Sequence, residues 1–120
     1  MTPDEAIRRT HSLLKALGLT GPQGEPLWQV RVVDWDVLQE VAKDPKKDIR
    51  GLTRFGAREI LYDWNWIEDM DAESLIEHEV AHALSGESEC ENNPKFDEAL
   101  KKIAEFYSAA EPTGPVTLPC

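Results

Sequence analysis

The residues best suited to chemistry form one short stretch, His78-Glu79-Val80-Ala81-His82, which has the HExxH pattern. At about 100° per residue of a helix, His78 and His82 lie one turn apart on one face, so both imidazoles can meet a single ion. Zinc accepts nitrogen ligands at about 2.0–2.1 Å in a tetrahedron, half of which these two residues can fill. Glu79 is rotated away from them and can reach a metal-bound water. The stretch therefore predicts a Zn²⁺ site with His78 and His82 as ligands and Glu79 as general base.

Residues 71–86 are expected to form the helix that carries this stretch. Asp71 is a good N-cap, Glu73 adds negative charge to the first turn, and Gly86 provides a C-terminal stop. Apolar residues on the side away from the histidines are expected to pack on the core, namely Ile76, Val80, Ala83 and Leu84. The alternative is a surface amphipathic helix with merely polar histidines. Two of the three histidines of the chain surround one glutamate here, which favours the metal site.

The length and composition indicate a single folded domain. The chain has 120 residues, 41% of them hydrophobic, with four tryptophans, which favours a packed core over disorder. Its formal net charge of −10 disfavours a nucleic-acid-binding surface, which needs clustered lysine and arginine. No apolar run has membrane-spanning length and no leader-like segment opens the chain, so a cytoplasmic protein with no membrane partner is expected. Cys90 and Cys120 make no disulfide framework and suit a reducing compartment.

The other segments predict a small α+β domain around the motif helix. Pro3 opens an N-terminal helix, and the alternation of Trp28, Val30 and Val32 with polar residues is typical of a strand. Residues 34–42 are ambiguous but suit a short helix. A hairpin is expected from residues 49–55 and 58–63, and a C-terminal helix from residues 94–108. The predicted fold is an N-terminal helix, a three-stranded mostly antiparallel sheet, the HExxH helix and a C-terminal helix.

This order of elements resembles the SprT-like (Spartan) zinc metallopeptidases. The matching segments are residues 28–30, 51–53, 59–62, 75–84 and 92–96, within a resemblance that covers roughly residues 5–107. It implies that residues 1–110 form one zincin-like metallopeptidase domain, followed by a Pro-rich tail in residues 111–120. It also implies peptide-bond hydrolysis by a zinc-activated water with Glu79 as general base. Action on DNA-bound proteins is not expected, because the chain has no basic or zinc-ribbon appendage.

The resemblance leaves the third zinc ligand open. Family members usually have a zinc-binding histidine four residues before the aromatic residue of the last helix, and here Phe96 places Asn92 at that position. Asparagine is a poor zinc ligand. Three residues of the preceding loop have acceptable donors, namely Glu89, Cys90 and Glu91. Glu91 is the predicted ligand among them. Minigluzincins use a glutamate of the following helix, here Glu98, but its expected direction is away from the apolar stripe.

Further roles also stay open. An oxyanion would need a donor, for which the candidates are Tyr62, Arg54 and Tyr107. In such zincins a substrate often lies beside an edge strand, which the strand of residues 58–63 could provide. The expected partner is a protein or peptide substrate, and the acidic residues that flank the motif helix favour a basic one. The alternative function is a catalytically weak or inactive zincin-like binding or regulatory module that lacks the third histidine.

Overall fold

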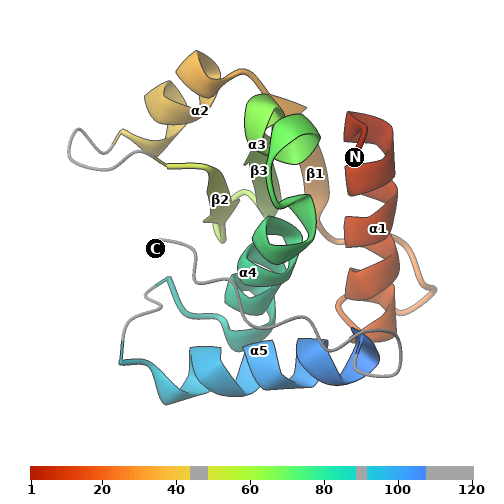
Figure 1. Ribbon diagram of the computed structural model, residues 1–120. Helices are drawn as coiled ribbons and strands as arrows, with labels where there is room; N and C mark the ends of the chain where they lie inside the picture. Colours follow the sequence, from red (N-terminus) through yellow and green to blue (C-terminus); the bar gives the residue numbers. More distant parts are fainter. Residues whose placement is uncertain (44–48, 89–91, 108–120) are drawn as a thin grey trace.

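The second strand of the predicted hairpin is the central strand of the sheet. The computed structural model describes residues 1–43, 49–88 and 92–107, and of residues 106–107 the backbone only. The elements of these residues are α1 (Pro3–Ala16), β1 (Gln29–Val33), α2 (Trp35–Ala42), β2 (Gly51–Arg54), β3 (Glu59–Asp63), α3 (Trp64–Asp69), α4 (Ala72–Ser85) and α5 (Pro94–Tyr107) (Figure 1). The predicted α+β class is confirmed. The predicted tail, residues 111–120, lies outside the described residues.

The strand order is β1-β3-β2, and β3 pairs on both sides. β2 and β3 are antiparallel, as the predicted hairpin requires, whereas β1 runs parallel to β3 with Val30 beside Ile60. The sheet is therefore mixed rather than mostly antiparallel, because α2 and β2 provide the long connection that parallel neighbours need. The expectation that the strand of residues 58–63 offers a free edge is wrong. β3 is central and each of its residues is buried.

Alternation along β3 divides the core between the two faces of the sheet. Ile60 and Tyr62 face the larger cluster, which includes residues of α1, α4 and α5, while Leu61 faces a smaller cluster with Leu38 of α2. This is the division that period-2 alternation predicts. Figure 1 shows the result, with α1 beside β1, α5 crossing under α4, and α2 at the other end of the molecule. The sheet thus has helices on both faces.

Two of the smaller helices had weak sequence signals. The ambiguous segment of residues 34–42 is helical, with Asp34 at the N-cap of α2. Residues 64–69, for which the sequence predicts no element, form α3, whose one buried side chain is Ile67. A six-residue helix spans less than two turns, so its apolar residues cannot establish a period of 3.6.

The helix α4 lies at the centre of the fold. It packs against β2, α1, α3 and α5. Its apolar residues Ile76, Val80 and Ala83 are buried as predicted, and Leu84 is half-buried. The opposite side is buried too, since the exposed fractions are 9% for His78, 4% for Glu79 and 6% for His82. The three motif side chains are therefore buried where α4 packs against β2 and α5.

Candidate metal centre

The local sequence of α4 fixes the spacing of the two histidines. The Asp71 side chain accepts a hydrogen bond from the Ser74 amide at 3.1 Å and so caps the first turn. At the other end Gly86 has a φ of 73°, and its amide donates to the His82 carbonyl. The uninterrupted helix between these caps holds the histidines at i and i+4 on one face. This confirms the predicted helix and both of its caps.

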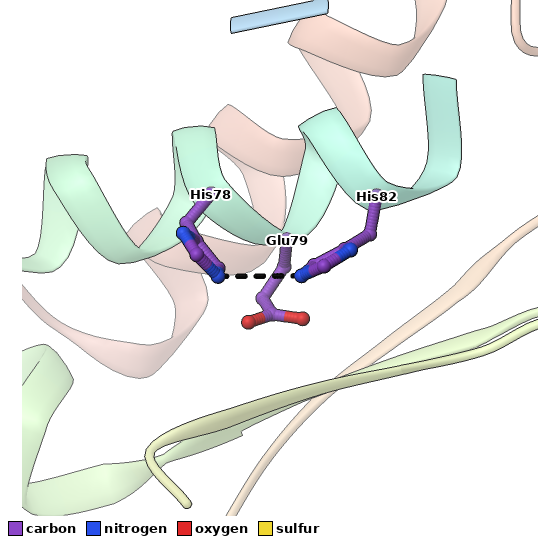
Figure 2. A group of neighbouring side chains, drawn as sticks. All are labelled: His78, Glu79 and His82. Carbon is purple, nitrogen blue, oxygen red and sulfur yellow. Dashed lines mark hydrogen bonds between the residues drawn. The ribbon is translucent and has the colours of Figure 1, made fainter. Parts of the chain in front are cut away.

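The two imidazoles point their Nε2 atoms at each other across a gap of 3.2 Å (Figure 2). Two nitrogen ligands at about 2.0–2.1 Å from one tetrahedral ion would be roughly 3.3 Å apart, so this spacing fits a shared zinc. The Nδ1 atom of His82 lies 2.7 Å from the Glu87 carbonyl oxygen, which can only accept, so Nδ1 carries a proton and Nε2 a lone pair. Without an ion, His78 Nε2–H donates to that lone pair. Binding of a metal at Nε2 would require this proton to move to Nδ1, so that the ring stays neutral.

Burial sets the charge of the three motif side chains. Desolvation, assisted by the neighbouring His82, lowers the pKa of His78 from 6.5 to about 4. The ring is therefore neutral near pH 7, the form that binds metals. Desolvation also raises the pKa of Glu79 from 4.5 to about 7, and the hydrogen bond from Thr53 opposes that rise. A carboxyl group with this pKa is matched to proton transfer near neutral pH.

Two residues of the strand β2 contact the Glu79 side chain and hold it in place. The Thr53 hydroxyl lies 2.8 Å from Glu79 Oε1 and 3.0 Å from the Glu79 carbonyl oxygen. Gly51, two residues earlier on the same face of the strand, comes so close that an added Cβ would lie 2.8 Å from Glu79 Cγ and Oε2. Figure 2 shows the carboxylate below the gap between the two imidazoles. Neither Thr53 nor Gly51 was predicted at the site from the sequence.

Phe96 packs against both imidazoles. Its ring centroid lies 5.2 Å from that of His78 and 4.6 Å from that of His82, and its exposed fraction is 2%. Asn93 caps the start of α5, because its Oδ1 accepts hydrogen bonds from the amides of Lys95 and Phe96. The start of α5 thereby fixes Phe96 over the histidines. Such packing limits the rotamers of both rings and keeps water from one side of the pair.

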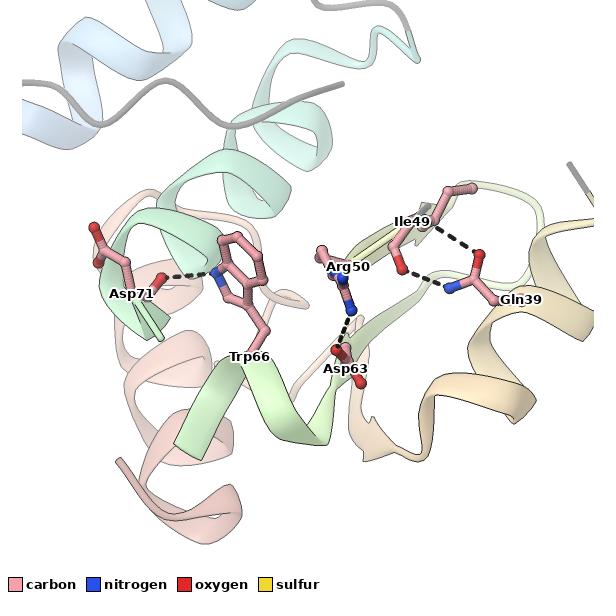
Figure 3. A network of polar contacts seen from close by, with 6 residues as sticks. All are labelled: Gln39, Ile49, Arg50, Asp63, Trp66 and Asp71. Atoms are coloured by element: carbon pink, nitrogen blue, oxygen red, sulfur yellow. Dashed lines mark hydrogen bonds and ion pairs between the residues drawn. The ribbon is translucent and has the colours of Figure 1, made fainter. Parts of the chain in front are cut away.

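A polar network holds the start of β2 in place (Figure 3). The Gln39 side chain accepts from the Ile49 amide and donates to the Ile49 carbonyl, at 3.2 and 2.6 Å. Arg50 pairs with the fully buried Asp63 at 3.1 Å and lies 5.5 Å from the centroid of the Trp66 ring. The Trp66 indole donates to the Asp71 carbonyl. The network ties the residue before Gly51 to β3, to α3 and to the N-cap of α4.

The described residues bring together His78, Glu79 and His82, whose ligand atoms all lie within 4.8 Å of one another. No other His, Cys, Asp or Glu of residues 1–43, 49–88 and 92–107 joins that group. Glu98 is exposed on α5, in agreement with its expected direction, and Asn92 is exposed as well. The predicted third ligand Glu91, together with its alternatives Glu89 and Cys90, lies outside the described residues.

Two of the candidate oxyanion donors have other roles. Tyr62 is fully buried on the α1 side of the sheet, where its hydroxyl lies 3.0 Å from Thr10 Oγ1. Arg54 projects from the opposite face of β2 to Thr53 and pairs with Glu59 at 2.9 Å. The side chain of the third candidate, Tyr107, lies outside the described residues. Among the described side chains, Tyr62 is therefore paired with Thr10 and Arg54 with Glu59.

Comparison with protein-family models, curated proteins and solved structures finds no match to this chain. Among the described residues, no helix combines the length and apolar character needed to cross a membrane.

Proposed function

We propose that the chain is a zinc-dependent metallopeptidase in which His78 and His82 hold the metal and Glu79 is the general base. The observation that carries the proposal is the 3.2 Å separation of the two Nε2 atoms, with the Glu79 carboxylate at the gap. The hydrogen bond between His82 Nδ1 and the Glu87 carbonyl supports it, because it directs the lone pair of His82 toward His78. Both rings are neutral ligands in this arrangement.

When bound, zinc would activate a water molecule and polarise the scissile carbonyl of a peptide. Glu79 would take the proton of that water and later pass it to the leaving amine. Thr53 donates to Oε1, so Oε2 is the oxygen left to receive the proton. Burial raises the pKa of Glu79 to about 7 in the metal-free protein. A zinc ion at the gap would lower this pKa again and so favour the carboxylate that accepts the proton.

The substrate would lie along β2 as an added strand. The Asp63 amide donates to the Arg50 carbonyl, so this opposed pair is hydrogen-bonded. Bonded and non-bonded pairs alternate along an antiparallel ladder, which directs the N–H and C=O of Gly51 and Thr53 away from β3. In the described chain β2 pairs with β3 alone. A peptide paired to these outward groups would pass beside Gly51 and Thr53, the two residues that contact Glu79.

A specific observation favours a second candidate function, a zincin-like binding or regulatory module with little or no catalysis. In the described part of the chain the metal-ligand group contains two histidines and no third ligand apart from Glu79. Catalytic zinc sites normally have three protein ligands and one open position. A site with two ligands would bind zinc weakly. The peptidase proposal therefore requires a third donor, and Glu91 stays the predicted one.

Metal analysis combined with a cleavage assay separates the two functions. For a peptidase we expect one equivalent of zinc per chain, lost in His82→Ala and retained in His11→Ala, which removes the histidine that lies outside the motif. Cleavage of a casein-like substrate should disappear in Glu79→Gln while zinc stays bound. Weaker zinc binding in Glu91→Gln would identify the third ligand. Zinc without cleavage supports the binding module, and absence of zinc from the wild-type protein would refute the peptidase.

A further inference from the structure

Two adjoining cavities lie at the edge of the sheet opposite the candidate metal centre. β1 and β2 occupy the two edges, and the cavities follow β1. The larger has a volume of about 860 Å³ and is lined by residues 26–31, by residues 56–58 and by His11. The smaller has a volume of about 120 Å³, and its lining includes Leu27 and the α1 residues Leu14 and Lys15. His11, Pro26, Leu27 and Trp28 line both, so the two form one continuous groove.

The smaller cavity is suited to an aliphatic side chain. Its apolar lining consists of Leu14, Leu19, Pro26, Leu27 and Trp28. An apolar cavity of about 150 Å³ can take up benzene, so one of about 120 Å³ has room for an isobutyl group. Trp28 is 8% exposed and makes an edge-on contact with Phe55, at a centroid distance of 6.1 Å. This wall of the cavity is therefore preformed.

The larger cavity carries the opposite charge to the chain as a whole. Its ionisable lining residues are His11, Arg31 and Arg58, whereas the formal net charge of the chain is −10. Arg31 shares the buried Glu59 carboxylate with Arg54, at 3.5 and 2.9 Å, so one negative charge there faces two guanidinium groups. No aspartate or glutamate lines either cavity in the described chain. The local excess of positive charge favours an anionic ligand.

The backbone presents Arg58 to this groove in an unusual conformation. Its φ is 50°, in the left-handed region that glycine occupies most easily. The Arg58 amide closes a turn with the Phe55 carbonyl at 3.3 Å, and the Arg58 carbonyl accepts from the Gln29 amide. The Arg58 side chain is exposed, and no ion pair or hydrogen bond occupies its guanidinium among the described residues. An arginine at a position where glycine is easier indicates a use for its charge.

We propose that the groove beside β1 binds an acidic peptide segment that carries an aliphatic side chain. The aliphatic side chain enters the smaller cavity, and the neighbouring carboxylates pair with Arg58 and Arg31. A peptide fits better than a nucleic acid, because nucleotides have no aliphatic group for a cavity lined by leucines. It fits better than a small carboxylic acid, because the larger cavity follows six consecutive residues of the chain, 26–31. This site is independent of the proposed peptidase activity.

Fluorescence anisotropy with three labelled octapeptides tests the proposal. The first alternates glutamate with leucine, the second replaces each glutamate with lysine, and the third replaces each leucine with serine. The proteins are the wild-type chain, Arg58→Gly, Leu27→Ser and the control Arg8→Gln, which changes an exposed arginine of α1 outside both cavities. Glycine suits the φ of 50°, so Arg58→Gly should melt at an equal or higher temperature than the wild-type chain.

We expect the glutamate–leucine peptide to bind the wild-type chain at least tenfold more tightly than either other peptide, and more weakly as salt rises. Arg58→Gly should weaken this binding about tenfold, Leu27→Ser should remove the preference for leucine, and Arg8→Gln should change the affinity less than twofold. Equal effects of Arg58→Gly and Arg8→Gln would overturn the proposal. So would tighter binding of the lysine peptide, of hexanoate or of a single-stranded oligonucleotide.

Discussion

The substitution Glu79→Gln should stabilise the metal-free protein, and by an amount that depends on pH. Burial raises the pKa of Glu79 from 4.5 in the unfolded chain to about 7 in the folded one. Below the lower value both states hold the proton, and the carboxyl group costs the fold nothing. Between the two values the unfolded state loses the proton first, so the free energy of unfolding falls as pH rises. Glutamine keeps a similar shape without this titration.

The expected difference follows from the size of the pKa shift. At about 1.4 kcal/mol per pKa unit, the wild-type protein should lose about 3 kcal/mol relative to Glu79→Gln once the pH exceeds the folded-state value. The two proteins should be equally stable near the unfolded-state value of 4.5. His78 also titrates differently in the folded and unfolded states, with a folded pKa of about 4. The contribution of Glu79 is therefore taken from the difference in free energy of unfolding between the wild-type protein and Glu79→Gln, in which the effect of His78 cancels.

Urea unfolding in the presence of a chelator, repeated from about pH 5 to about pH 8.5, measures this difference. With a slope of about 1.5 kcal/mol per molar urea, the midpoints should separate by roughly 2 M at the alkaline end. Glu98→Gln, which removes an exposed carboxylate of α5, is the matched control and should follow the wild-type curve. Parallel curves for Glu79→Gln and the wild-type protein would refute the argument that burial penalises the carboxylate.

Three further substitutions test the surroundings of the motif. Thr53→Val should lower kcat about tenfold with zinc still bound, whereas Thr53→Ser keeps the hydroxyl and should stay near the wild-type rate. Gly51→Ala places a methyl group 2.8 Å from Glu79 Cγ, so denaturant unfolding should show a loss of about 1–3 kcal/mol. Arg50→Ala leaves Asp63 buried without its ion pair and should cost about 3–5 kcal/mol by the same measurement.

The sequence could predict the motif because its geometry is local. Two histidines at i and i+4 on a capped helix share a face whatever surrounds that helix, so the pair follows from His78, His82, Asp71 and Gly86 alone. The hairpin likewise follows from two adjacent strands. The parallel pairing of β1 was missed because Val30 and Ile60 are thirty residues apart, and no local pattern encodes such a register.

The contacts of β2 with Glu79 could not be predicted for the same reason. Thr53 and Glu79 meet only because β2 packs against α4, and they are 26 positions apart in the chain. Gly51 offered a signal of a different kind, a glycine inside a predicted strand, which often marks a close approach of another group. Here that group is the side chain of Glu79.

The cost of burying Glu79 and its proposed role have one cause. A carboxyl group in water has a pKa too low to hold a proton near neutral pH, so a base of this kind must be desolvated to take part in both directions of proton transfer. Desolvation makes the carboxylate unfavourable for the fold, and Thr53 offsets part of that penalty without removing it. If Glu79 were only structural, a neutral side chain would serve better at this position. The predicted stabilisation by Glu79→Gln and the predicted loss of cleavage in the same variant are therefore two consequences of one arrangement.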